Sequence, residues 1–188
     1  MKRTTHASVV GLLLLATSAS VAAQSRVPDA GMWGFGGSIG ANGPADASLQ
    51  TSLDLTGNIE RYLTPRVSMR GQVGAAWWDI TGRTFTGTVT PVFFDGNLVY
   101  NWEGGAVHPY VTGGVGVYHF HASEAALGGS DTKPGFDLGG GIEFFFHRHA
   151  TMTGELTYHK IGAFSSPLTT FNDGSFWRFG IGAKVYTR

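Results

Sequence analysis

The chain has 188 residues, with 13 Lys and Arg against 13 Asp and Glu, and it contains no Cys. The balanced charge argues against nucleic acid as a partner, and the lack of Cys excludes disulfides and thiolate metal sites. Glycine accounts for 29 residues and charged residues for only 14%, whereas soluble domains average about 7% Gly and about 25% charged residues. This composition favours a lipid-facing β-barrel over an ordinary soluble domain.

The N-terminus has the pattern of an export signal. Lys2 and Arg3 precede an apolar run at 9–16, and small residues follow as far as Ala23. The apolar run is too short to cross a bilayer as a helix, which needs about 20 residues. We therefore predict a signal peptide at 1–23 and a single domain at 24–188. Cleavage after Ala23 removes two basic residues, so the mature chain has 11 basic against 13 acidic residues and a formal charge of −2.

The domain is predicted to contain eight strands, because apolar and polar residues alternate in segment after segment. Several segments exceed the usual five or six residues and match the 9–11 residues of a tilted membrane strand. The predicted strands are Met32–Ala41, Leu49–Tyr62, Arg66–Trp78, Thr86–Trp102, Pro109–Phe120, Phe136–Phe146, Thr151–His159 and Trp177–Tyr186.

The connections between these strands alternate in length. Tight connections at 63–66, 103–106 and 147–149 are typical of periplasmic turns. Longer connections rich in Gly, Ser and Asp, at 42–48, 79–85, 121–133 and 163–175, fit the outer side of the membrane. An even number of strands then places both termini in the periplasm.

Aromatic residues gather near the predicted strand ends, where the amphipathic ring suits the lipid headgroups. The predicted girdle residues are Trp77, Trp78, Tyr100, Trp102, Tyr110, Phe144, Phe146 and Trp177.

The stretch Pro109–Tyr118, the glycine-rich segment Phe136–Phe145 and the following Thr153–Tyr158 together resemble the outer-membrane β-barrel domain of the OmpA-type, porin-like superfamily. This resemblance implies an all-β fold, an eight-stranded antiparallel up-and-down transmembrane β-barrel in the outer membrane of a Gram-negative bacterium. It also implies outer-membrane lipids, lipopolysaccharide and the barrel-assembly machinery as partners. We expect a monomer without a cofactor and with a structural, surface-interaction or small-pore role.

The polar strand faces carry the candidate functional residues. Ionised groups in a narrow barrel must be paired or hydrated, and an eight-stranded barrel is about wide enough for side chains alone. The alternatives are an internal salt-bridge network and a narrow path that prefers cations. The predicted lumen residues are Asp54, Glu60, Arg70, Asp95, Asp137, Glu143, Glu155, Arg178 and Lys184.

Two other classes of function remain open as alternatives. A lipid A deacylase places a His-x-Ser-Asn motif on its seventh strand. In this chain, His159 is the candidate base for such a mechanism and the more distant Asp173 its candidate acidic partner. The nucleophile position is Ile161, which cannot attack a carbonyl, so we predict that the chain is not an enzyme. A soluble lipocalin-like barrel would need its apolar faces to point inward.

The chain also contains two histidine pairs with i, i+2 spacing, His119 with His121 and His147 with His149. Two imidazoles on one side of a strand can contribute to a zinc or copper site if a third ligand is present. We interpret these pairs as solvated residues and predict no metal site.

Overall fold

A computed structural model of the chain describes residues 28–80, 87–102, 105–123, 129–166, 169–171 and 173–187. These residues form strands and no helix, so none of the described segments is a helix able to cross a bilayer. The predicted signal peptide lies outside the described residues. The strands are β1 (Trp33–Pro44), β2 (Ser52–Tyr62), β3 (Val67–Ala76), β4 (Trp78–Asp79), β5 (Thr88–Asn101), β6 (Val107–Ser123), β7 (Gly129–His147), β8 (Ala150–Ile161), β9 (Phe164–Ser166), β10 (Thr169–Phe171) and β11 (Phe176–Thr187).

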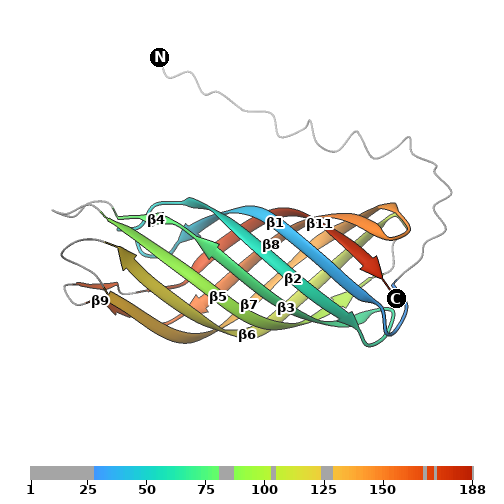
Figure 1. Ribbon diagram of the computed structural model, residues 1–188, viewed down its shortest axis with the longest axis horizontal. Coiled ribbons are helices and arrows are strands. Elements are labelled where there is room, and N and C mark those ends of the chain that lie inside the picture. Colours follow the sequence, from blue (N-terminus) through green and yellow to red (C-terminus); the bar gives the residue numbers. More distant parts are fainter. Residues whose placement is uncertain are drawn as a thin grey trace, which may run out of the picture.

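The sheet closes into a barrel of eight antiparallel strands. Its order runs β3-β2-β1-β11-β8-β7-β6-β5, and pairing of β3 with β5 completes the ring. The two-residue β4 continues β3 along the same neighbour, β5. Figure 1 shows the resulting cylinder of tilted strands, with β9 at the end opposite the C-terminus. We call that end the loop end, and the end where β1 begins and β11 finishes the termini end.

The eight predicted strands are all present, and their lengths differ mainly at the loop end. β6 and β7 continue pairing to Ala122 and Gly129, so most of the connection predicted at 121–133 is a sheet extension. The connection predicted at 163–175 contains the β9–β10 hairpin. Gly, Ser and Asp are common in loops, but in these segments the paired strand of a hairpin provides hydrogen bonds for their backbone groups.

The apolar strand faces point out of the barrel. Ile39, Leu53, Val115 and Leu138 are each more than 60% exposed, and their neighbours on the same faces are also exposed. Side chains of alternating residues point to opposite faces, so the polar residues between them face the interior. This is the reverse of what the lipocalin-like alternative requires.

The aromatic girdle prediction is wrong for two residues. Trp78 and Tyr110 are buried inside the barrel, at 0% and 3% exposure, whereas the other six predicted girdle residues are exposed. Trp78 has the same parity as the inward-facing Arg70 and donates its indole N–H to Asn42 Oδ1 at 2.7 Å. The Tyr110 hydroxyl donates to Glu155 at 2.8 Å. Their polar atoms have partners inside, so neither ring needs the headgroup region.

Buried apolar side chains occupy both ends of the interior. Near the loop end, one cluster contains Leu49, Ala76, Trp78, Ile80, Val89, Phe93, Tyr118, Phe120, Ala122, Ile161, Phe164 and Phe176; we call it the outer cluster. At the termini end, Met32, Tyr62 and Tyr186 pack with the partly buried Phe145; we call this the inner cluster. The polar interior therefore lies between two apolar plugs.

Candidate functional site

The interior between the two clusters brings together nine charged side chains. The inward faces of β2, β3, β5, β7, β8 and β11 each supply at least one of them. Each is at most 8% exposed. The nine are Asp54, Glu60, Arg70, Asp95, Asp137, Glu143, Glu155, Arg178 and Lys184.

Glu60 is the centre of the ion pairs nearer the termini end. Its Oε2 accepts from Arg70 Nε at 3.2 Å and from Lys184 Nζ at 2.6 Å. The Ser68 hydroxyl donates to Oε1 of the same carboxylate. Lys184 also lies 3.4 Å from Glu143 Oε1. Glu60 is thus compensated by two cations, and Lys184 links it to a second acid.

Glu143 connects this network to the inner cluster. Its Oε1 accepts from the Thr151 hydroxyl at 2.6 Å and from the Tyr186 hydroxyl. The Tyr62 and Tyr186 hydroxyls are 3.4 Å apart. The aromatic residues that close the termini end are therefore tied to the charged layer by hydrogen bonds, which fixes their position.

Glu155 joins the two arginines. Arg70 Nη1 lies 2.5 Å from its Oε2, and Arg178 Nη1 lies 3.9 Å from its Oε1. Arg178 Nε donates to Asp54 Oδ1 at 2.8 Å. Asn42 Nδ2 donates to the other oxygen of that carboxylate at 3.1 Å. Through Asn42 and the indole of Trp78, the charged layer reaches the outer cluster.

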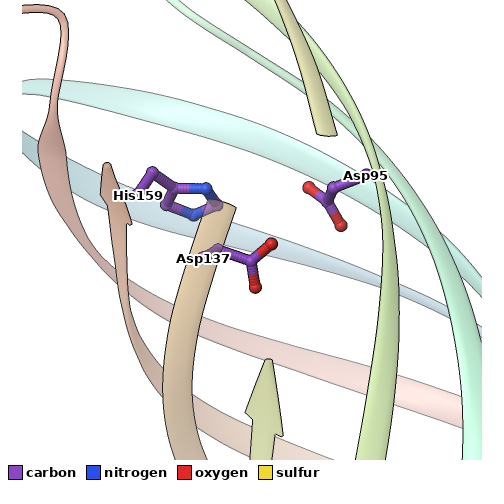
Figure 2. A group of neighbouring side chains, drawn as sticks. All are labelled: Asp95, Asp137 and His159. Carbon is purple, nitrogen blue, oxygen red and sulfur yellow. The ribbon is translucent and has the colours of Figure 1, made fainter. Parts of the chain in front are cut away.

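Asp95 and Asp137 differ from the other four acids. Neither makes a salt bridge with any residue that the structure describes. Asp95 Oδ1 accepts from Asn97 Nδ2 at 2.5 Å, while Oδ2 of each aspartate is buried without a hydrogen-bond partner. Both lie close to His159, and one ligand atom from each of the three groups falls within 4.8 Å of the others. Figure 2 shows the two carboxyl groups and the imidazole facing a common space.

His159 and Asp173 have separate partners. His159 is fully buried, and its ring nitrogens bond the hydroxyls of Tyr118 at 2.9 Å and Thr157 at 3.2 Å. Asp173 pairs with Lys160 at 3.2 Å and accepts from the backbone N–H of Ser175. The Ile161 side chain is buried in the outer cluster. The acids that share a space with His159 include Asp95 and Asp137.

The two histidine pairs singled out in the sequence lie on the surface. His119, His121, His147 and His149 are all exposed. His119 Nδ1 bonds the Thr132 hydroxyl at 2.8 Å, and the rings of His147 and His149 are 6.0 Å apart.

Several interior residues were missed by sequence reasoning. Asn42, Tyr110 and Thr151 bond the charged groups directly. The alternation along each strand could have identified Asn42 and Thr151, because each lies an even number of positions from residues on the same strand that face inward. For Tyr110 the signal was weak, since the glycines of β6 obscure the alternation.

A small cavity lies in the charged layer. A cavity of about 10 Å³ lies beside Ser38, Asn58, Arg70, Tyr110 and Glu155, and about that volume is needed to hold one water molecule. Side chains therefore fill the space around this cavity, as the width of an eight-stranded barrel allows.

Comparisons with known proteins agree on one fold. A family model described as "Outer membrane protein beta-barrel domain" matches residues 11–186. The structure of Neisserial surface protein A is similar, with a TM-score of 0.63 and 10% identity over 83% of this chain and 97% of that one. The outer membrane protein OprG from Pseudomonas aeruginosa gives 0.64 and 14% over 85% and 97%.

A third similar structure is Ail, the attachment invasion locus protein of Yersinia pestis, in complex with the heparin analogue sucrose octasulfate. It gives a TM-score of 0.61 and 12% identity over 84% of this chain and 99% of that one. At these identities the likeness concerns the fold. A comparison with curated protein sequences gave no significant match.

Proposed function

Since the chain belongs to the family of outer membrane protein beta-barrel domains, we propose that it is a sealed barrel that anchors its loop-end hairpins at the cell surface. Of the roles expected from the sequence, this one combines the structural and the surface-interaction roles and leaves out the pore. The observation that carries it is the filled interior.

The interior is closed in three successive layers. The inner cluster closes the termini end, where Tyr62 and Tyr186 are 1% and 5% exposed. The ion pairs around Glu60 and Glu155 fill the middle. The outer cluster closes the loop end, where the rings of Phe120 and Phe164 stack at 4.0 Å. A hydrated ion would have to displace all three layers to cross.

The described strands of the loop end form a platform. β6 and β7 are 17 and 19 residues long, well beyond the 9–11 residues that a membrane strand needs, so their hairpin projects past the bilayer. Asp131 on β7 accepts the backbone N–H of Ser165 on β9 at 2.9 Å and pairs with Lys133 at 3.2 Å. Segments held on a rigid scaffold are common binding surfaces. The name of Ail, an attachment protein with this fold, supports the same role.

Export and membrane insertion precede this anchoring role. Residues 1–23 direct export and are removed after Ala23, and the barrel-assembly machinery inserts 24–188 as a monomer, in contact with lipopolysaccharide. The termini end faces the periplasm and the loop end faces outward.

We propose no catalytic role, because the Asp173 partner that a His159-based mechanism would use is engaged with Lys160 and Ser175.

Planar-bilayer recordings test the sealed barrel. The refolded protein should give no conductance above the lipid background, and the Glu143→Gln variant should be equally silent. Heat-modifiable migration in detergent gels shows beforehand that both samples are folded. Unitary conductance in the wild type that changes in Glu143→Gln would overturn the proposal, since current would then pass the charged layer.

Surface labelling tests the orientation. An epitope inserted between Ser123 and Gly129 should bind antibody on intact cells, whereas one inserted between His147 and Ala150 should bind only after permeabilisation. The reverse pattern would refute the placement of the loop end outside. N-terminal sequencing of the purified mature protein should begin at Gln24, and a retained Met1 would refute the cleavage.

A further inference from the structure

The interior of the barrel carries more acidic than basic groups, and the surplus is localised. Among the residues that the structure describes, six interior acids face three bases, and the ion pairs join the bases to Asp54, Glu60, Glu143 and Glu155. This leaves Asp95 and Asp137, which lie next to each other. Two ionised carboxylates buried without a counter-charge are strongly unfavourable. Something else must therefore neutralise this pair.

The strand register builds a space around the pair. Asp137 on β7 lies directly opposite His159 on β8. Asp95 reaches them from β5 across β6, whose intervening inward residues are Gly114 and Gly116. A Cβ at Gly116 would lie 2.8 Å from the Cβ of Asp95, and one at Gly114 would lie 2.4 Å from Asn97 Oδ1. The absence of side chains on β6 is what lets the two aspartates approach each other.

Two unpartnered atoms point to a ligand in this space. Asp95 and Asp137 are 1% and 4% exposed, and Oδ2 of each has no hydrogen-bond partner. Buried polar atoms are nearly always bonded, so an unsatisfied one calls for a physical explanation, and a bound ion is one. The imidazole of His159 faces the same space (Figure 2) and adds a nitrogen donor.

We propose that Asp95, Asp137 and His159 bind one divalent transition-metal ion, Zn²⁺ or Mn²⁺, as a structural site inside the barrel. Two carboxylates neutralise a divalent charge, and Zn²⁺ accepts both carboxylate oxygen and imidazole nitrogen, with water in the fourth position. The ligand atoms lie within 4.8 Å of one another. Bonds of about 2 Å to one ion bring such atoms within about 4 Å, so binding draws the three side chains together.

The surroundings of His159 suit a metal ligand. One ring nitrogen exchanges its hydroxyl partner for the ion, and the other keeps its bond to Tyr118 or Thr157. Such a second hydrogen bond orients a ligating imidazole. The ion would join β5, β7 and β8 across the interior, below the outer cluster. Because that cluster covers the site, the ion enters as the barrel folds.

Refolding experiments test the site. The denatured chain is treated with chelator, refolded in detergent with Zn²⁺, Mn²⁺ or chelator, and passed through a desalting column before its metal content is measured. The wild type should retain about one ion per chain, and the metal should raise its thermal unfolding midpoint. The double variant Asp95→Asn/Asp137→Asn should lose both effects. Asp173→Asn, a surface acid at the same end, serves as the matched control and should keep them.

Each outcome decides the proposal. Heat-modifiable migration verifies that the variants fold, and the Asn side chains preserve shape while removing buried charge. Retention by the double variant equal to that of the wild type would overturn the proposal and point to the exposed histidine pairs. A folded wild type that retains neither metal would also overturn it, and protons would then neutralise the two carboxylates. Conductance plays no part in this readout, so the result is independent of the sealed-barrel proposal.

Discussion

Replacing Arg70 with Met should destabilise the folded barrel strongly. Arg70 is 5% exposed and pairs with Glu60 at 3.2 Å and Glu155 at 2.5 Å. Methionine preserves most of the side-chain length and removes the charge. Glu60 keeps Lys184 at 2.6 Å. Glu155 keeps the neutral Tyr110 hydroxyl as a hydrogen-bond donor at 2.8 Å, but its remaining described cation, Arg178, lies 3.9 Å away. The loss therefore falls mainly on Glu155.

The expected magnitude follows from the burial of that orphaned carboxylate. Breaking a buried ion pair by removing one partner costs about 3–5 kcal/mol, which lowers the ratio of folded to unfolded protein by a factor of roughly 10²–10⁴. Arg61→Met is the matched control, since Arg61 is exposed and stacks over Trp33 at 4.7 Å. An exposed contact of this kind contributes about 0.5–1 kcal/mol.

Urea unfolding in lipid vesicles, followed by tryptophan fluorescence, measures the difference. The double variant Arg70→Met/Glu155→Gln should recover part of the lost stability, because it removes the orphaned charge. An Arg70→Met variant as stable as Arg61→Met would refute the reasoning. It would mean that water reaches the network and screens the charges, which would also weaken the case for a sealed interior.

Three further substitutions test the packing. Val115 is 70% exposed on the lipid-facing side, and Val115→Arg should lower the free energy of unfolding by about 2–4 kcal/mol in the same assay. The control Val107→Arg, at the first residue of β6, should lower it by about 0–1 kcal/mol. Equal losses would contradict the membrane placement. Gly116→Ala should destabilise the barrel by about 1–3 kcal/mol, because the new Cβ would lie 2.8 Å from Phe94 O. The control Gly57→Ala, whose Cβ would have nothing within 4 Å, should be neutral or stabilise by about 0.5–1 kcal/mol. Similar effects at both glycines would argue against the close approach on β6. Trp78→Ala should lower the free energy of unfolding by about 3–5 kcal/mol, because it leaves a cavity in the outer cluster. A loss below about 1 kcal/mol would show that this cluster is loosely packed.

The sequence determined the strands and their two faces. A two-residue period is local, so Leu53, Leu55 and Ile59 could be assigned to one face of a strand without knowledge of its neighbours. The pattern of long strands joined by alternating short and long connections then favoured closure into a membrane barrel. The errors at Trp78 and Tyr110 arose because aromatic position was judged by distance from a turn instead of by strand parity.

Only the tertiary structure decided which interior groups meet. Glu60 bonds Lys184 across 124 positions of the chain, and Arg70 bonds Glu155 across 85. Such pairings depend on the register and tilt of strands around a closed ring, which no local pattern encodes. The same register places Asp95 and Asp137 beside His159 and opens a space at Gly116, because β6 presents glycine between them. The sequence supplied the charges, and barrel closure determined which remain without a partner.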